Sequence, residues 1–547
     1  MPSLEQGGPR NVQAAIIGTW RPNAAMVIQY TDVFRLLAGV FISWLVYQTF
    51  IYPRFLSPLR HLPGPKNDQP LFGQLLSQYR APSPTQKYLE WSARWSHAPL
   101  IRYRGFFNME HLLINNVEAH KQVLQTNCYS FKKPSLFARL VKDISGKGLL
   151  FSEGFEHKHQ RKLIANAFST PNLWKLFPVF LAKAEDLALH IDAKVQEDGG
   201  HGEIEVFSTF SKATIDVIGV STLGIELRNL KSSKLDMDFL QCYERMFNQS
   251  PLSAFISFID AHIPVRWCLP LEASRGFLQA SQEVKRMLIS CIHTRNLELA
   301  TRKKDAAQEF VSRDLLTYML EERLDKKLEL SDEDILGHLL NFLSAGLVGH
   351  ETTSVSLTWA SYILAARPEI QERLRAEIQA FRYSNISLNY GSVDRLPYLN
   401  NFVRELLRVF SPAVVLYREA AEDVTICGIA IPKGTVLTVP PCATNLSKVI
   451  WGEDSLEFDP DRWDRVTGDA TGPYGIESFL NGPRTCLGKQ YALIEIKVML
   501  VELLSQFTFS KGKTLLDLGD EPVPLCNPAV SLRPQGGLKA KIQRLNT

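Results

Sequence analysis

The chain has 547 residues, of which 45% are hydrophobic and 22% charged, and its formal net charge is +4. This length and apolar content are enough to bury a sizeable core. The chain is only weakly basic and lacks the clusters of lysine and arginine that nucleic-acid binding requires, so we expect no nucleic-acid partner. Eight cysteines without a C-x-x-C pair argue against structural zinc and against a disulfide framework.

A charge-free stretch near the N-terminus, residues 36–52, lies between Arg35 and Arg54 and predicts a helix. At 1.5 Å per residue it is roughly 26 Å long, which is sufficient to cross a membrane. It begins too far into the chain for a removed signal peptide, so we expect an uncleaved anchor after an N-terminal segment, residues 1–35. A buried core helix is the alternative.

A proline-rich segment, residues 53–70, follows the expected anchor. Its prolines, beginning with Pro53, predict that the helix ends there and that a stiff hinge leads into the main domain, residues 71–547. That domain is mostly helical in pattern, with β-like runs at 100–103, 111–114 and 435–439. We therefore predict a mainly α fold with small β-sheets.

A basic segment at 154–162 contains His157 and Arg161, which lie one helical turn apart and share a face. Both side chains can donate to one carboxylate. A solvated basic face is the alternative.

A long helix is predicted from Ser331, where acidic residues occupy the first turn, to Ala366, just before Arg367-Pro368. It would be roughly 50 Å long. Residues 348–353, Val-Gly-His-Glu-Thr-Thr, form a polar cluster near its middle. Such a cluster inside an apolar helix lowers helix propensity and costs desolvation free energy, which favours a functional role for it.

Glu405 and Arg408 lie three residues apart in a helical run and can form an ion pair. On a surface such a pair would contribute little. Residues 458–463, Phe-Asp-Pro-Asp-Arg-Trp, add a second arginine, Arg462.

The most informative segment is 479–488, Phe-Leu-Asn-Gly-Pro-Arg-Thr-Cys-Leu-Gly. It places one cysteine between two glycines, just after an arginine and just before a predicted helix at 489–504. Backbone N–H groups, a helix N-terminus and a nearby cation stabilise a thiolate, the form of cysteine that binds metal. An ordinary buried thiol is the alternative.

The pattern F-x-x-G-x-R-x-C-x-G, carried by Phe479, Gly482, Arg484, Cys486 and Gly488, resembles the haem-binding loop of the cytochrome P450 monooxygenases. The resemblance implies the cytochrome P450 fold and a haem b, an iron protoporphyrin, with the Cys486 thiolate as axial ligand of the metal. Further family-like segments occur in the family's order, so the resemblance covers most of the main domain.

Residues 348–353 resemble the oxygen-activation motif of this family. The resemblance implies that Gly349 lets the long helix pass close over the haem and that Glu351 and Thr352 relay protons to dioxygen. Val348 stands where the family more often has alanine, and its larger side chain would narrow the space for substrate.

Four residues match positions that contact the haem propionates in the family: His157, Arg161, Arg418 and Arg484. At His157 the family more often has tryptophan. Glu405, Arg408 and Arg462 match a structural network that holds the core beneath the haem.

The resemblance also implies partners and a location. Electrons would come from NADPH through the membrane-bound NADPH-cytochrome P450 reductase, with cytochrome b5 as a second donor. Lys158, Lys162 and Lys489 lie beside haem motifs and are our candidates for docking that acidic partner. The family's microsomal members predict a single-pass protein of the endoplasmic reticulum membrane with a cytosolic catalytic domain.

The substrate is expected to be a lipophilic small molecule, because the apolar segments 412–416 and 527–530 align with regions that line the family's pocket. The sequence resembles filamentous-fungal members that act in secondary-metabolite pathways on terpenoid, polyketide or alkaloid scaffolds. Two alternatives stay open: a haem-thiolate isomerase or dehydratase that consumes no oxygen, and a membrane-tethered haem protein that only binds a ligand.

Overall fold

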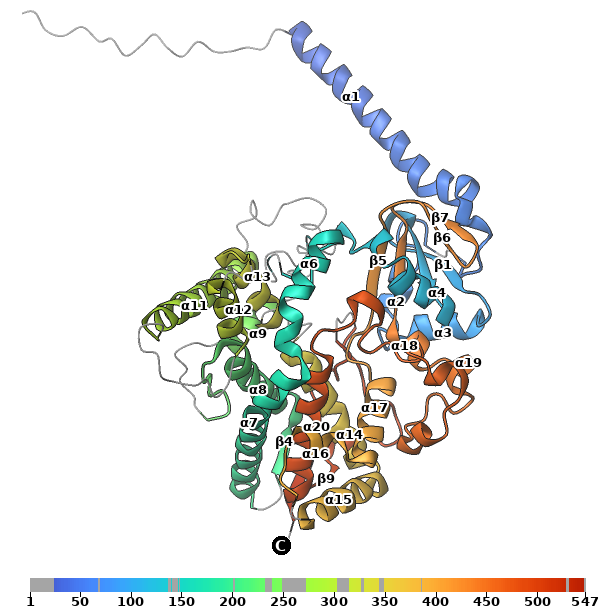
Figure 1. Ribbon diagram of the computed structural model, residues 1–547. Helices are drawn as coiled ribbons and strands as arrows, with labels where there is room; N and C mark the ends of the chain where they lie inside the picture. The colour runs from blue at the N-terminus through green and yellow to red at the C-terminus, as the bar shows by residue number, and fades with distance from the viewer. Residues whose placement is uncertain are drawn as a thin grey trace, which may run out of the picture.

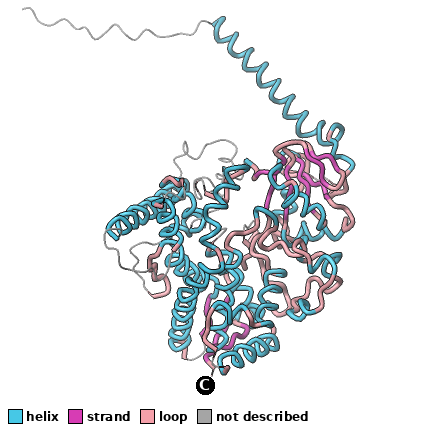
Figure 2. The backbone as a smooth tube through the Cα atoms, in the orientation of Figure 1, coloured by secondary structure: helices cyan, strands magenta, loops and turns pink. Residues whose placement is uncertain are grey.

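A computed structural model describes residues 24–66, 69–135, 139, 146, 148–199, 202–231, 239–247, 272–302, 314–325, 329–343, 349–384, 386–527 and 531–545. Figure 1 shows a mostly helical body from which one long N-terminal helix projects. Figure 2 shows that strands gather in one part of this body and in a smaller group at its opposite end, and that helices and loops form the rest. The expected mainly α fold with small sheets is confirmed.

The α-helices of the described ranges are α1 (Ala24–Val46), α2 (Leu75–Tyr79), α3 (Gln86–Arg94), α4 (Val117–Lys121), α6 (Gly154–Ala165), α7 (Thr170–Glu197), α8 (Val206–Ile218), α9 (Phe239–Phe247), α11 (Glu272–Arg302), α12 (Leu315–Leu324), α13 (Asp332–Leu343), α14 (His350–Ala366), α15 (Pro368–Tyr383), α16 (Tyr390–Asp394), α17 (Pro397–Val409), α18 (Pro441–Asn445), α19 (Lys448–Trp451), α20 (Lys489–Gln506) and α21 (Lys513–Leu518). Short π- and 3₁₀-helical turns of the described ranges include η1 (Tyr47–Leu56), η2 (Pro58–His61), η3 (Phe106–Asn108), η4 (Gln122–Thr126), η7 (Gly219–Leu223) and η8 (Pro460–Asp464).

The larger sheet has the strand order β1-β2-β8-β5-β3. Its strands β2 and β8 run parallel, and its other neighbours run antiparallel. The three strand runs expected from the sequence are β1, β2 and β8 of this one sheet. The strands are β1 (Leu100–Arg104), β2 (Glu110–Ile114), β3 (Phe131–Lys132), β5 (Leu416–Ala420) and β8 (Val436–Val439) in this sheet, β4 (Gly202–Glu205), β10 (Lys539–Arg544) and β9 (Phe507–Lys511) in a second, and the hairpin β6 (Val424–Ile426) with β7 (Ile429–Ile431).

The main core forms where α7, α14, α17 and α20 meet. Helix α17 shows how the sequence builds it, because Pro397 starts the helix and Leu399, Phe402, Val403 and Leu406 recur at helical spacing. All four apolar side chains are fully buried. Helices α14 and α20 are buried on nearly every face, so they run through the centre of the domain.

Two expectations about helix ends need correction. The expected helix 331–366 is described as two helices, α13 and α14; of the residues between them, 344–348 lie outside the described residues and Gly349 precedes α14. The N-terminal helix does not stop at Pro53, because the π-helical turn η1 continues to Leu56. The Ser57 N–H bonds to the Tyr52 carbonyl at 2.9 Å, a five-residue step that needs no N–H from proline.

Candidate active site

The cysteine loop follows a tightly constrained path in front of α20. Leu480 and Gly482 both have positive φ angles, 53° and 72°. A Cβ on Gly482 would overlap the carbonyl oxygen of Leu124 in η4, so glycine is required there by close packing. The Cys486 N–H donates to the Phe479 carbonyl at 2.8 Å, which closes the loop.

Gly488 is placed differently from Gly482. Its φ is −83°, and a Cβ there would meet no described protein atom within 4 Å. The protein's own packing therefore gives no reason for glycine at 488, whereas it gives one at 482. The helix that follows begins at Lys489, as the sequence predicted.

The thiol of Cys486 lies among groups that favour its negative form. Loss of water around the sulfur raises the pKa of Cys486, while the Gly488 N–H and the charges of Arg161 and Lys489 act to lower it. Arg161 also donates to the Thr485 carbonyl at 2.8 Å, so it is anchored to the loop. Binding of a metal cation would deprotonate the thiol outright.

A cluster of cationic side chains lies next to the cysteine loop. Arg484 forms an ion pair with Glu153, and its Nε has no hydrogen-bond partner among the described residues. Burial and the neighbouring Arg484 lower the pKa of Arg418 to about 10. Burial, Arg418 and Arg484 lower the pKa of Lys133 to about 7. Within the described part of the chain, Glu153 is the carboxylate that faces this group.

Buried positive charges in excess of negative ones are costly unless an anion compensates them. The cluster, with an unpartnered buried guanidinium nitrogen, therefore fits the carboxylates of a dianionic cofactor such as haem. Together with the cysteine loop it matches the donor set that a haem thiolate requires.

His157 joins this cluster from α6. Burial, followed by the charge of Arg484, lowers the pKa of His157 to about 4, so the imidazole is neutral near pH 7. Its Nδ1 lies 3.2 Å from the Tyr129 hydroxyl. A neutral imidazole carries one N–H, so His157 can still donate a single hydrogen bond.

The start of α14 carries Glu351 and Thr352. Gly349 precedes the helix, where a Cβ would overlap the Phe342 carbonyl of α13, so glycine permits the contact between these two helices. Glu351 is buried, and its Oε1 accepts a hydrogen bond from Ser531. Thr352 is half-buried. Val348, expected to narrow the substrate space, lies outside the described residues.

Ser531 is held against Glu351 by the C-terminal segment. The Leu532 N–H donates to the Pro412 carbonyl at 2.9 Å, and the Leu532 carbonyl accepts from Trp359 Nε1 at 2.6 Å. The expected pocket segment 412–416 thus lies beside Ser531. Of the second expected segment, residues 528–530 lie outside the described residues.

Glu405, Arg408 and Arg462 come together in a buried network. Glu405 accepts from Arg408 Nη2 at 2.7 Å and Nε at 2.9 Å, and from Arg462 Nε at 3.3 Å. Arg408 also donates to the Asn445 carbonyl at 2.9 Å, and Asn445 Oδ1 accepts the Glu477 N–H at 2.7 Å. The network is therefore connected through Asn445 to the segment that enters the cysteine loop.

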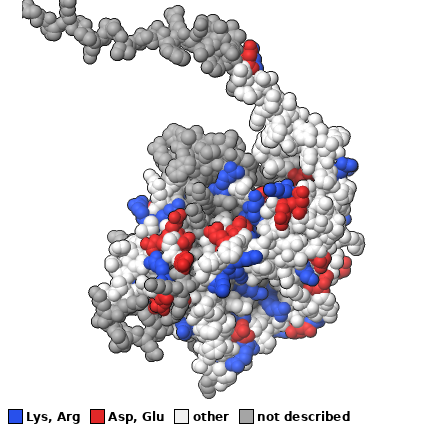
Figure 3. All heavy atoms as spheres, turned by 45° about the horizontal axis from the view of Figure 1, so that its top comes forward, with Lys and Arg blue, Asp and Glu red and all other residues white. Residues whose placement is uncertain are grey.

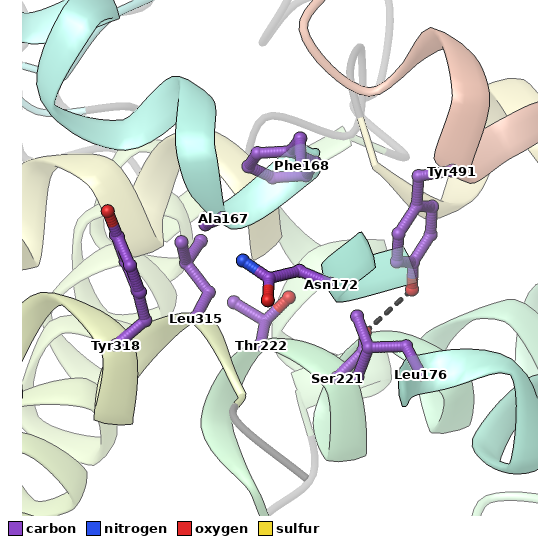
Figure 4. Close-up of a pocket in the computed structure, with 9 residues that line it drawn as sticks. All are labelled: Ala167, Phe168, Asn172, Leu176, Ser221, Thr222, Leu315, Tyr318 and Tyr491. Atoms are coloured by element: carbon purple, nitrogen blue, oxygen red, sulfur yellow. Dashed lines mark hydrogen bonds between the residues drawn. The ribbon is translucent and has the colours of Figure 1, made fainter. Parts of the chain in front are cut away.

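A separate small pocket opens between α7, η7, α12 and α20 (Figure 4). The Tyr491 hydroxyl points across it to Ser221, 2.6 Å away. None of the residues that line it is one of the expected site residues, so we do not assign it to the substrate.

Sequence reasoning missed four residues of this site: Lys133, Glu153, Asn445 and Ser531. Glu153 directly precedes the basic segment, and Lys133 could have been suspected from the pair Lys132-Lys133 before Pro134. Asn445 and Ser531 carry no local signal, because their partners lie far away in the chain.

The cysteine loop, the cationic side chains around it and the buried core that contains α14 and α20 define a haem-thiolate protein. The cytochrome P450 family model matches residues 63–537. The chain belongs to the cytochrome P450 family: it is a monooxygenase whose cofactor is haem with a cysteine axial ligand. It is 31% identical to cytochrome P450 monooxygenase FUM15 of Gibberella moniliformis, over 92% of this chain and 91% of that protein. It is also 31% identical to cytochrome P450 monooxygenase sphH of Aspergillus fumigatus, over 95% of each chain.

Proposed function

We propose that this monooxygenase uses NADPH-derived electrons to hydroxylate, epoxidise or further oxidise a lipophilic small molecule of a fungal secondary-metabolite pathway. The observation that carries the proposal is the cysteine loop, in which Cys486 lies beside Arg161 and Lys489 and within a cluster of cations. The fungal relatives support a place in such a pathway, and the apolar character of segment 412–416 supports a lipophilic substrate.

We assign the axial ligand to Cys486. Haem, when bound there, supplies an iron that activates dioxygen, and electron donation from the thiolate favours O–O cleavage. The guanidinium groups of Arg161, Arg418 and Arg484 would bind the propionates, and His157 would donate one hydrogen bond. Phe479, Gly482 and Gly488 shape the loop that presents the sulfur.

We assign proton transfer to the carboxylate of Glu351 and the hydroxyl of Thr352. Ser531 donates to Glu351 Oε1 and so orients this carboxylate at the start of α14. Gly349 lets α14 start close to α13. Glu405, Arg408 and Arg462 hold the fold beneath the cofactor and take no part in the chemistry.

We further propose that the chain is anchored in the endoplasmic reticulum membrane by one span and receives electrons from NADPH-cytochrome P450 reductase, with cytochrome b5 as a second donor. The candidate span is the helical stretch Arg35–Leu56, close to the expected 36–52, and little of it is buried. Figure 3 shows almost no charged side chains along the part of this helix that is not drawn in grey, apart from a few next to the grey atoms. Lys158, Lys162 and Lys489 are exposed, as docking of an acidic partner requires.

The carbon monoxide difference spectrum of the dithionite-reduced full chain, beside Cys486→Ser, tests the assignment. We expect a strongly red-shifted Soret band that the variant lacks. A haem-loaded, folded wild type without this band would refute thiolate ligation. Product formation without NADPH or another electron donor would instead favour an isomerase or dehydratase.

A further inference from the structure

The hydrogen-bonding role of His157 depends on where its proton lies. A neutral imidazole has one N–H, on Nδ1 or on Nε2, and its other ring nitrogen is an acceptor. Burial, followed by the charge of Arg484, lowers the pKa of His157 to about 4, so this neutral form is present near pH 7. An anion is bound only by the nitrogen that carries the N–H, so the choice between the two tautomers decides what His157 can bind.

Tyr129 is the residue in hydrogen-bond contact with this ring. Its hydroxyl lies 3.2 Å from His157 Nδ1, and the two ring centroids lie 5.9 Å apart. Within the described part of the chain, the imidazole has no other hydrogen-bond partner. His157 is buried, so solvent has little access to compete for Nδ1.

The hydroxyl of Tyr129 is the donor in this bond. A phenol O–H is a stronger donor than an imidazole N–H, and an imidazole lone pair is a stronger acceptor than a phenol oxygen. Two cations act in the same direction, because Lys158 Nζ lies 4.2 Å and the Arg484 guanidinium carbon 5.3 Å from the centroid of the Tyr129 ring. Positive charge next to the ring draws electron density from the phenol oxygen and strengthens its O–H as a donor. Nδ1 of His157 therefore accepts, which places the N–H on Nε2.

The fold holds the hydroxyl and the imidazole together through the backbone. Tyr129 lies in the 3₁₀ turn η5 (Cys128–Ser130), directly before β3, and β3 pairs with β5, the strand that carries Arg418. The start of α6 is attached to the same segment, because the Glu153 side chain accepts the Lys133 N–H at 2.9 Å. Both partners of the bond are thus fixed to the strand that brings one of the cluster's arginines into place.

The surroundings identify the kind of group that an N–H on Nε2 would bind. After burial, the charges of Arg484, Lys133 and Arg161 are what lower the pKa of His157, so these cations lie close to it. Within the described ranges, Glu153 is the carboxylate that acts on this pKa in the opposite direction. The excess of positive charge favours an anion beside the imidazole. With the N–H on Nδ1 instead, the lone pair of Nε2 would repel that anion.

We propose that Tyr129 is a positioning residue of the haem site: its hydroxyl donates to His157 Nδ1 and so fixes the tautomer whose Nε2–H binds a carboxylate of the cofactor. The ring of Tyr129 has a separate role, because it packs against Lys158 and Arg484. This inference rests on the proposed binding of the haem propionates by His157.

Tyr129→Phe tests the proposal, because it removes the hydroxyl and keeps the ring with its two cation contacts. The measurement is the rate at which haem transfers from the full-length holoprotein to an excess of an apoprotein acceptor. We expect transfer to be about fivefold faster, the equivalent of one hydrogen bond. Tyr103→Phe is the matched control, because the Tyr103 hydroxyl also makes one side-chain hydrogen bond, to Thr438 at 2.7 Å, between β1 and β8. We expect its transfer rate to equal that of the wild type, and equal acceleration in the two variants would overturn the proposal.

A double-mutant cycle shows whether Tyr129 acts through His157. We expect Tyr129→Phe to accelerate haem transfer in the wild-type background and to have no effect in the His157→Phe background. Equal acceleration in both backgrounds would refute the proposal, because the hydroxyl would then act without the imidazole. The propionate bending band in the resonance Raman spectrum of the ferric protein is the second readout, since it responds to hydrogen bonds on the carboxylates. It should shift in Tyr129→Phe and not in Tyr103→Phe, and an unshifted band in Tyr129→Phe would contradict the tautomer assignment.

The carbon monoxide band separates this inference from the proposed function. Every variant retains Cys486, so the band establishes that each is folded and loaded with haem before its transfer rate is compared. Wild type with the band, but without coupling between Tyr129 and His157, would refute the inference alone. Wild type without the band would refute the proposed thiolate ligation. An unchanged transfer rate in His157→Phe would refute propionate binding by His157, and the inference would fall with it.

Discussion

Replacing Glu405 by glutamine removes the negative charge from a network that is entirely buried. Glu405 accepts four hydrogen bonds, two from Arg408, one from Arg462 and one from the Asp459 N–H at 3.0 Å. The amide of glutamine turns an NH₂ group toward these donors and leaves Arg408 charged without a counter-ion among the described residues. Losing one or two charge-assisted bonds costs about 1.5–3 kcal/mol each, and breaking a buried ion pair costs about 3–5 kcal/mol.

We therefore expect Glu405→Gln to lower the free energy of unfolding by about 3–5 kcal/mol, out of the roughly 5–15 kcal/mol typical of proteins. Asp461→Asn is the matched control. Asp461 lies next to Arg462, but its bidentate pair with Arg373, at 2.7 and 2.8 Å, is solvent-exposed. Such an exposed pair contributes only about 0.2–1 kcal/mol.

The assay is a urea titration of the haem-loaded full chain, followed by loss of the carbon monoxide band. The shift of the urea midpoint, multiplied by the slope of the free energy of unfolding against urea concentration, gives the change in the free energy of unfolding. We expect a shift for Glu405→Gln several times that for Asp461→Asn. Equal shifts for the two variants would refute the argument that burial makes this network important.

Three further predictions concern single side chains. Burial raises the pKa of Glu477 from 4.5 to about 8, so the folded chain keeps a proton that the unfolded chain releases, and stability falls as pH rises through this window. Glu477→Gln should flatten the pH dependence of the thermal midpoint between pH 6.5 and 8, which lies above the range in which nearby His120 titrates. An unchanged slope of the midpoint against pH would contradict this prediction. Ser531→Ala removes the hydroxyl that donates to Glu351, and we expect product formed per NADPH consumed to fall about tenfold, the equivalent of one bond to a charged group. Unchanged coupling would contradict the orienting role of Ser531. Arg484→Lys keeps the positive charge but loses the planar guanidinium group with its paired N–H donors. Transfer of haem from the variant to an apoprotein acceptor should therefore be about tenfold faster than from the wild type. Equal rates for the two proteins would speak against propionate binding by Arg484.

The parts of the site that could be predicted from the sequence are those whose partners lie nearby in the chain. Cys486, its glycines and the start of α20 fall within a dozen residues, and Glu405 and Arg408 lie three apart on one helix. Arg462, 57 residues beyond Glu405, was indicated by the family resemblance and not by spacing. The continuation of the N-terminal helix through Pro53 was not predicted, because the carbonyls of η1 are bound by Arg102, Arg104 and Asn108 from the β1–β2 hairpin.

The sequence by itself determined the family and the start of α20 and pointed to Cys486 as the thiolate ligand, since periodicity, turn residues and short motifs act over a few residues. Only the tertiary structure decided which groups surround them. Ser531 meets Glu351 across 180 residues, and Arg484 meets Glu153 across 331. Such contacts depend on how helices and sheets pack, and a burial-driven packing leaves no spacing in the chain from which the pairs could be predicted.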